Sequence, residues 1–273
     1  MSFPLELRYQ ICMQPIELPV FNAVALELLQ QLADQDVAME QVIDTINKDQ
    51  GLAIQILRMA NSSAYSGRYK SETIKESVNR LGARQISSLA MAASQAALHH
   101  SSVPLVHEIM QGLWQHSHAC AVGCRSLAAA IGSHDLAEQA YLAGLLHDIG
   151  KLYLIKAMER ISLDPANQCS LDLETVLDVF SDMHVEQGCR IMDHWDIPQR
   201  YYQIVAHHHD DEPDPEDRLL AIVRLANFNS TQYGLNLYPQ YLQPENTLPE
   251  VHLLGVSDEL LARLETDMKA ACA

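Results

Sequence analysis

Side chains of the types that bind metal ions recur through the second half of the sequence. The chain has 13 histidines, and those of interest fall in four separate segments: His116 and His118, His147 beside Asp148, His184, and the run His207–His209. Neutral imidazoles together with a carboxylate are the usual ligands of zinc, iron, manganese and similar ions. Such an ion promotes hydrolysis by lowering the pKa of a bound water and neutralising charge on a phosphoryl oxygen. The pattern predicts a metal site assembled from several segments.

The pair His147 and Asp148 lies inside the otherwise apolar stretch AGLLHDIGKL. A carboxylate buried in such a stretch is costly unless a cation or a metal ion accompanies it. We therefore predict that Asp148 takes part in a functional site. Lys151 follows three residues later and has two interpretations: a cation at the C-terminus of a helix, or an anion-binding residue of the same site.

Spacing alone leaves the roles of the other histidines open. His116 and His118 lie about 200° apart around a helix, so at most one of them faces a common site. His184 shares a helix face with Gly188 and Ile191, which we expect to pack inward, so His184 is either a ligand or a core histidine.

Two further groups of side chains have less decisive spacing. The run His207–His209 cannot face inward as a whole, because successive residues of a helix turn by about 100°. One or two of these three imidazoles are therefore predicted to bind the metal. Cys120 and Cys124 share a helix face with His116, and we assign both thiols to small apolar packing.

The elements that position these side chains are predicted to be helices. Hydrophobic residues make up 48% of the 273 residues, aromatic residues only 6%, and there are 11 glycines, which favours an all-α fold. Helical periodicity and helix punctuation recur along most of the chain. The predicted helical stretches are 18–34, 37–49, 50–67, 71–98, 107–132, 135–158, 173–198, 201–209, 217–234 and 257–270.

Two positions interrupt the helical pattern. Gly82 marks either a break between two helices or a close helix contact. The stretch HHSSVPL, residues 99–105, is the most loop-like part of the first half. It predicts two parts: an N-terminal helical subdomain at 1–100, and a second helical part at 101–273 that carries the metal site and a C-terminal helix.

Charge and cysteine usage restrict the partners and the compartment. The net charge of −17 and the pI near 5.0 disfavour binding to nucleic acid or to an anionic membrane. No uninterrupted apolar run reaches the roughly 18 residues of a membrane-spanning helix. The six cysteines form no CxxC pair and no leading signal sequence is evident, which predicts a cytoplasmic protein.

With these residues described, the chain resembles the HDOD family, a branch of the HD superfamily of helical metal-dependent phosphohydrolases. The resemblance covers about residues 15–230. In the first half it rests on Leu18-Pro19, on VIDTINKDQGLAIQILRMANSSAYSG with its Asn61-Ser62 pair, and on SVNRLGARQI. Gln50 departs from the pattern, because the family usually has a proline after the aspartate.

The second half is similar to the family in LWQHSHACA, AYLAGLLHDIGKL, HVEQGCRIMDHWDIP and HHH. Matching these motifs to the superfamily favours His116 over His118, and His208 and His209 over His207. The resemblance implies these metal ligands: His116, His147, Asp148, His184, His208 and His209. The last superfamily ligand, an aspartate, is replaced here by Asn227. An amide oxygen is neutral, so Asn227 is expected to bind hard cations more weakly and cannot accept a proton.

The resemblance implies an HD-like multi-helix bundle that holds one or two divalent ions: iron, manganese, zinc, nickel or magnesium. We expect a bacterial signal-transduction protein that contacts a signalling protein or a phosphorylated small molecule. The alternative is a metal-dependent phosphohydrolase acting on a nucleotide, a cyclic dinucleotide or another phosphoester. In that case Lys151 or Asp148 is expected to assist attack on phosphorus.

Overall fold

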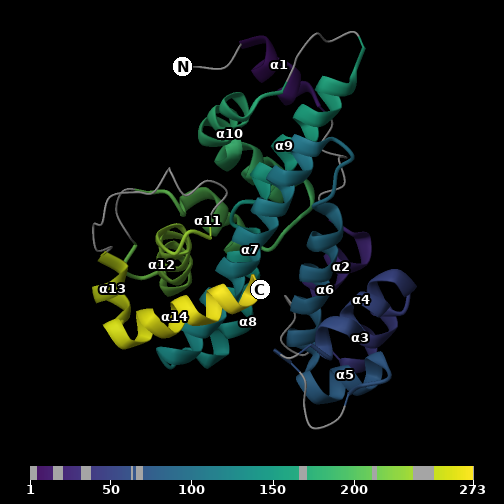
Figure 1. The fold of residues 1–273 in the computed structure, drawn as a ribbon. Coiled ribbons are helices and arrows are strands. Elements are labelled where there is room, and N and C mark those ends of the chain that lie inside the picture. Colours follow the sequence, from purple (N-terminus) through teal and green to yellow (C-terminus); the bar gives the residue numbers. More distant parts are fainter. Residues whose placement is uncertain are drawn as a thin grey trace. The chain divides into compact units, whose positions relative to one another are not determined.

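The computed structural model describes residues 5–14, 21–31, 38–62, 64–65, 70–165, 171–210, 214–235 and 249–272. These residues form helices with no strand among them, which confirms the all-α prediction (Figure 1). Contacts divide the chain into two compact units: unit 1 combines Met1–Val20 with His99–Ala273, and unit 2 is Phe21–Leu98. The predicted parts, 1–100 and 101–273, stay a prediction; the contact units differ from them by placing the first twenty residues with the second part.

Unit 2 is a group of helices around α6. Its helices are α2 (Ala23–Gln31), α3 (Met39–Ile46), α4 (Gln50–Ala60), α5 (Ile74–Leu81) and α6 (Ala83–Leu98). Helix α6 packs against each of the other four. Gly82 has a φ of 84° and separates α5 from α6, so of the two interpretations of this glycine the break is the one observed.

Short polar side chains begin several of these helices. The Asp49 carboxylate accepts a hydrogen bond from the Leu52 backbone N–H at the start of α4. At the start of α5 the Thr73 hydroxyl accepts from the Glu76 N–H, and the Glu76 carboxylate accepts from the Glu72 N–H. Both arrangements satisfy N–H groups that a helix leaves without partners in its first turn.

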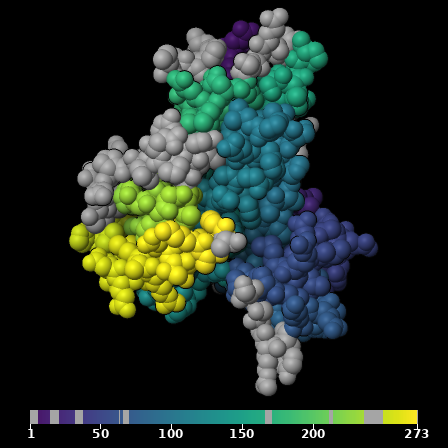
Figure 2. Space-filling view, viewed as in Figure 1, coloured from purple at the N-terminus to yellow at the C-terminus, as the bar shows by residue number. Residues whose placement is uncertain are grey.

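Unit 1 is built around one long helix, α7. Its helices are α1 (Leu5–Met13), α7 (Pro104–Ala130), α8 (Ala137–Leu146), α9 (Ile149–Leu163), α10 (Leu173–His194), α11 (Gln199–His207), α12 (Arg218–Gln232), α13 (Pro249–Leu254) and α14 (Asp258–Ala271), with a 3₁₀ turn at His134–Leu136. Helix α7 packs against α8, α9, α12 and α14. In the space-filling view α14 forms the outer surface of this unit beside α12 (Figure 2).

The helix predicted at 135–158 is two helices. Helix α8 ends at Leu146 and α9 begins at Ile149, so the break falls at His147 and Asp148. Asp148 has φ −104° and ψ 19°, outside the helical range, and serves as the N-cap residue of α9. Lys151 consequently lies in the first turn of α9, so the interpretation as a helix C-terminal cation is wrong.

Two helices were not predicted, and one sequence motif lies outside the described residues. Helix α1 shows little segregation of apolar from polar residues, and α13 has only six residues, so neither has a clear helical pattern. Leu18-Pro19 falls among the residues that are not described. Within the described part of the chain, no helix is both long enough and apolar enough to cross a bilayer.

Glycines allow the helices of unit 1 to approach closely. A Cβ atom on Gly150 would lie 1.9 Å from the His184 carbonyl oxygen and 2.8 Å from the Gly188 nitrogen. A Cβ on Gly188 would lie 2.6 Å from a Val205 methyl carbon. Because these spaces cannot hold a side chain, α9 and α10 meet nearly backbone to backbone, and the Val205 side chain of α11 packs directly against Gly188. This contact brings the start of α9 beside His184.

Candidate metal centre

Asp148 lies at the centre of a buried cluster of histidines. It is 4% exposed and is placed by the break between α8 and α9. His116 comes from the middle of α7, His184 from α10, and His208 from the residue that follows α11. The two carboxylate oxygens of Asp148 face different groups of side chains, so the cluster has two sides.

The Oδ2 side of the cluster contains two imidazoles and an ammonium group. The Nε2 atoms of His116 and His147 each lie 3.4 Å from Asp148 Oδ2, and 3.4 Å from one another. Lys151 Nζ donates a hydrogen bond of 2.6 Å to the same oxygen. The Lys151 side chain is about a quarter exposed, whereas the other three are buried. Lys151 therefore extends from solvent to the cluster.

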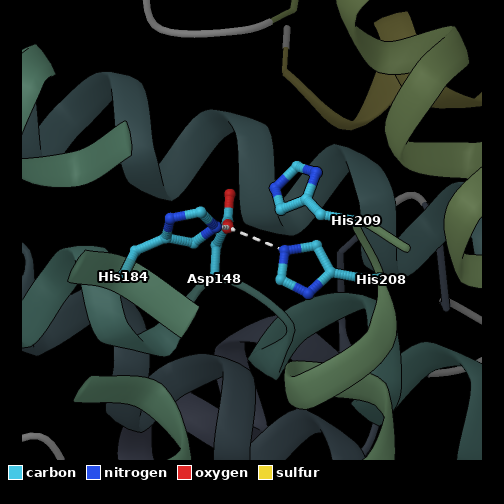
Figure 3. Close-up of side chains that lie close together, drawn as sticks. All are labelled: Asp148, His184, His208 and His209. Atoms are coloured by element: carbon cyan, nitrogen blue, oxygen red, sulfur yellow. Dashed lines mark ion pairs between the residues drawn. The ribbon is translucent and has the colours of Figure 1, made fainter. Parts of the chain in front are cut away.

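The Oδ1 side contains the other three histidines (Figure 3). His208 Nε2 lies 3.5 Å from Asp148 Oδ1 and His184 Nε2 lies 3.7 Å from it. Asp148, His184, His208 and His209 each offer a ligand atom within 4.8 Å of the others. His184 and His208 are buried, whereas His209 is exposed. This side therefore has four candidate ligands, one of which reaches solvent.

The protein orients each buried imidazole through its Nδ1 atom. His147 Nδ1 contacts the Gly144 carbonyl at 2.8 Å, His184 Nδ1 the Phe180 carbonyl at 2.6 Å, and His208 Nδ1 the Val205 carbonyl at 2.9 Å. A carbonyl oxygen only accepts, so Nδ1 carries the proton in all three rings and Nε2 has a free lone pair. Each Nε2 is thus prepared to act as a ligand.

His116 is oriented by a hydroxyl group instead of a carbonyl. Its Nδ1 atom lies 3.1 Å from the Ser230 hydroxyl, and that hydroxyl donates to the Leu235 carbonyl at 3.2 Å. Ser230 therefore accepts the Nδ1 proton of His116, which leaves the Nε2 lone pair of His116 facing the Nε2 lone pair of His147. Two facing lone pairs beside a carboxylate repel one another, and a cation between them would remove this repulsion.

Burial and the neighbouring charges keep the cluster in the protonation state that favours ligands. Burial lowers the pKa of His116 and His208, and with the Lys151 charge it lowers the pKa of His184 to about 3. Burial alone would raise the pKa of Asp148, but the Lys151 ammonium and the adjacent histidines hold it well below its usual value. Near neutral pH these imidazoles are therefore uncharged and the carboxylate is ionised.

Three buried polar atoms test whether the cluster fits a metal ion. Asp148 Oδ1, His184 Nε2 and His208 Nε2 have no hydrogen-bond partner among the described residues. All three are atoms of the kind that bind metal ions, and the two nitrogens lie 3.7 Å and 3.5 Å from Oδ1. Buried polar groups are almost always paired, and a divalent cation would pair all three at once. The residues present therefore fit a metal ion.

Two positioning contacts were not recognised from the sequence. Ser230 orients His116, as described above, and Arg224 on α12 is buried between the Glu250 carboxylate and the Asp210 backbone carbonyl. Because Asp210 immediately follows His209, the Arg224 contact joins the segment carrying His208 and His209 to α12 and α13. A serine and an arginine within a helix have no distinctive spacing, so the sequence contained no signal for either role.

Comparisons with known proteins decide the family. The profile of the HDOD domain matches residues 18–211. The chain belongs to the HDOD domain family. This confirms the resemblance seen in the sequence. An uncharacterized protein of Treponema pallidum (strain Nichols) is 24% identical over 217 residues, which is 77% of this chain. The chain spans less than half, 42%, of the length of that relative.

Solved structures share the fold of this HDOD chain. A Shewanella amazonensis SB2B protein, called a putative metal-dependent phosphohydrolase, aligns with a TM-score of 0.75 at 21% identity over 98% of this chain and 97% of its own. A Geobacter sulfurreducens HDOD domain protein of unknown function aligns with a TM-score of 0.74 at 21% identity, over 98% and 95% of the two chains. At these identities the comparison establishes the fold alone.

Of the HDOD ligand residues predicted from the sequence, the structure brings six together and leaves one undecided. The six are His116, His147, Asp148, His184, His208 and His209. Asn227 lies on α12 three residues before Ser230, so it shares a helix face with the residue that contacts His116. A metal-binding role for the Asn227 side chain stays a prediction.

The two alternative histidines lie away from the cluster. The His118 ring stacks on Trp114 with the centroids 5.0 Å apart. His207 Nδ1 contacts the Asp210 carboxylate at 2.9 Å, and both side chains are about half exposed.

Proposed function

We propose that this HDOD chain is a bacterial signal-transduction protein whose histidine cluster holds one or two divalent metal ions. The observation that carries the proposal is the convergence of four imidazole Nε2 lone pairs on the ionised, buried Asp148. A core histidine needs no such arrangement, because its second nitrogen can face an ordinary donor. The partners that we propose are a signalling protein or a phosphorylated small molecule.

The two sides of the cluster would hold the metal differently. On the Oδ2 side the ligands would be His116, His147 and Asp148; on the Oδ1 side they would be Asp148, His184, His208 and His209. A bound divalent ion supplies Lewis acidity, which lowers the pKa of a coordinated water and neutralises negative charge on a phosphoryl group. The carbonyl groups of Gly144, Phe180 and Val205 hold the rings in the orientation that this requires.

A phosphohydrolase is the second candidate function. It is favoured by Lys151 and His209, which both reach solvent beside Asp148. An ammonium group at this position binds and orients a phosphate anion as a point charge. Oδ2 of Asp148 accepts from Lys151, so the role that we propose for Asp148 is to hold this ammonium and to offer its free Oδ1 to a metal ion. The candidate substrates are nucleotides, cyclic dinucleotides and other phosphoesters.

We also propose a cytoplasmic location. The described cysteines are free thiols: Cys12, Cys120, Cys124, Cys189 and Cys272. Free thiols persist in a reducing compartment. The net charge of −17 supports a partner other than nucleic acid.

One preparation tests both candidate functions. The full chain is purified without chelator, its metal content is measured by elemental analysis, and turnover is assayed on a panel of phosphodiesters with added manganese, iron or zinc. We expect stoichiometric metal. Metal without turnover supports the signalling role, and turnover on any member of the panel supports the hydrolase. A chain that binds no metal under any of these conditions overturns both.

Two histidine variants identify the site in the same assay. His147→Ala removes a cluster ligand and is expected to lower metal content at least tenfold, as roughly estimated for loss of a metal-site residue. His118→Ala is the matched control, because His118 lies on α7 two residues from His116 but outside the cluster. Equal metal content in both variants would place the metal elsewhere. If the wild type binds metal without turnover, Asn227→Asp tests whether the neutral amide silences catalysis.

A further inference from the structure

The Oδ2 side of the cluster includes a thiol that the proposed ligand set does not use. Cys120 lies one helical turn after His116 on α7, and its Sγ atom is 3.7 Å from His116 Nε2. The ligand atoms of His116, Cys120 and His147 all lie within 4.8 Å of one another. Cys120 is 0% exposed and His147 is 1% exposed. The sulfur therefore adjoins the two facing imidazole lone pairs.

Four of the six distances between the candidate ligand atoms on this side are close to the edges of a tetrahedral metal site. A tetrahedral ion with bonds of about 2.0–2.1 Å to nitrogen and oxygen holds those atoms about 3.3–3.4 Å apart, and a sulfur bonded at about 2.3 Å lies about 3.5–3.6 Å from each. The Nε2 atoms of His116 and His147 lie 3.4 Å apart and each lies 3.4 Å from Asp148 Oδ2. The Cys120 sulfur lies 3.7 Å from His116 Nε2. His116, His147 and Asp148 thus need little movement to surround one ion, and the Cys120 sulfur lies within 4.8 Å of both imidazole nitrogens.

The charge of this side also favours a thiolate. Asp148 supplies one negative charge, and it is shared with the Lys151 ammonium. Helix α12, which faces His116 through Ser230, has no acidic residue along Arg218–Gln232. The two positive charges of a divalent ion between His116 and His147 would therefore exceed the negative charge that Asp148 supplies. A thiolate at Cys120, beside His116, would supply the second negative charge.

Cys124 shows what a packing cysteine looks like in the same helix. It lies one turn beyond Cys120 and is also 0% exposed. A Cβ on Gly144 would lie 2.7 Å from its sulfur, so the Cys124 thiol fills the close contact between α7 and α8. It belongs to neither group of candidate ligands. The two thiols share a helix face and a degree of burial, but only Cys120 adjoins nitrogen lone pairs.

We propose that Cys120 is a thiolate ligand, so that the Oδ2 side of the cluster is a site of two imidazoles, one carboxylate and one thiolate. This inference rests on the proposed metal binding and adds a prediction of which metal ions the site prefers. A thiolate ligand favours zinc, iron(II) and cobalt(II) over the hard ions magnesium and manganese. Burial raises the pKa of the Cys120 thiol, and a coordinated cation is what offsets that cost.

X-ray absorption spectroscopy of the zinc-loaded full chain tests the proposal directly. The expected spectrum has a sulfur shell at about 2.3 Å in addition to nitrogen and oxygen at about 2.0–2.1 Å. Cobalt(II) should give the near-ultraviolet charge-transfer absorption of a thiolate complex. Both signals should disappear in Cys120→Ser and persist in Cys124→Ser, the matched control.

The outcomes separate this inference from the function on which it rests. Bound zinc with only nitrogen and oxygen neighbours overturns the role of Cys120 and leaves the metal site intact. No bound metal overturns the proposed function, and the thiolate ligand with it. Loss of the sulfur signals in Cys124→Ser but not in Cys120→Ser also overturns the proposal. Even if a variant fails to fold, the wild-type spectrum shows whether a sulfur atom binds the zinc.

Metal competition gives a second readout. Zinc affinity should fall at least about tenfold in Cys120→Ser, while manganese affinity changes by less than about threefold. An equal loss for both metals would indicate a general disturbance of the cluster and contradict the proposed selectivity.

Discussion

A polar network in unit 2 and the Asp148 cluster in unit 1 differ in whether their hydrogen-bonding atoms are paired. In unit 2 the Asn61 amide is fully paired: its Oδ1 accepts from the Ser71 N–H and its Nδ2 donates to the Ser71 carbonyl, both at 2.8 Å. Arg80 donates to the neighbouring Ala60 carbonyl at 2.7 Å. In unit 1, Asp148 Oδ1 and the Nε2 atoms of His184 and His208 have no donor among the described residues.

The difference separates a group kept for folding from a group kept for a ligand. The Asn61 network closes the segment after α4 with hydrogen bonds internal to the chain, so it stabilises unit 2 by itself. In the Asp148 cluster Lys151 offsets the charge of the carboxylate, but Oδ1 and the Nε2 atoms of His184 and His208 are buried without hydrogen bonds, which is costly. Changes at the first network should therefore alter stability, and changes at the second should alter ligand binding.

The largest expected effect comes from Gly150→Ala. The new Cβ would lie 1.9 Å from the His184 carbonyl oxygen, so α9 and α10 must separate. We expect a loss of about 3 kcal/mol or more in the free energy of unfolding, together with loss of bound metal. Chemical denaturation and elemental analysis measure the two effects.

Gly51→Ala in α4 is the matched control for this change. Its Cβ would lie in ordinary contact, 3.4 Å from Asp49 Oδ1, and it should stabilise unit 2 by about 0.5–1 kcal/mol. Full metal binding by Gly150→Ala would show that the close approach of α9 to α10 is unnecessary for the cluster.

Asp148→Asn is the sharpest test of the contrast between the units. The new amide cannot replace the negative charge, so metal content should fall to background. The same amide is cheaper to bury than a carboxylate but loses the ion pair with Lys151, so the stability of the metal-free protein should change by less than about 1 kcal/mol. A marked loss of metal-free stability would mean that Asp148 serves folding. Asp135→Asn, an exposed isosteric change, is the control.

Asn61→Ala should give the opposite result. It leaves both backbone groups of the buried Ser71 without their partner, so we expect the free energy of unfolding to fall by about 1–3 kcal/mol. Metal content per folded chain should not change. Ser62→Ala, at the exposed next residue, controls for the change of side chain. Loss of metal at unchanged stability would contradict the division of roles.

The smallest effect is expected from Ser230→Ala. The hydroxyl that holds His116 Nδ1 is lost while every proposed ligand remains. Metal affinity should fall about 10–100-fold, as for other residues that orient a ligand. Thr231→Ala is the control, because the Thr231 hydroxyl contacts only the Asn227 carbonyl on its own helix. Equal affinities for the two variants would show that His116 needs no orienting partner.

Much of the fold followed from local patterns. Most helices of both units have apolar residues at helical spacing, and that spacing depends only on nearby residues. The break at His147 and Asp148 was missed because the residues on both sides of this pair in AGLLHDIGKL are mostly apolar, which leaves no periodicity to interrupt. Helices α1 and α13 were missed because one lacks a distinct apolar face and the other is a few residues long.

The sequence by itself determined the all-α class, the HDOD family and the set of residues from which a metal site could be assembled, because these depend on residue type and on spacing along the chain. The free nitrogen of His147, His184 and His208 follows from local helix geometry, because each Nδ1 contacts a carbonyl three or four residues earlier. Only the tertiary structure supplied the Ser230 hydroxyl that orients His116. It also decided that Gly150 and Gly188 permit the close approach of α9 to α10. Finally, it separated Cys120 from Cys124, which are alike in sequence and burial but differ in what lies beside the sulfur atom.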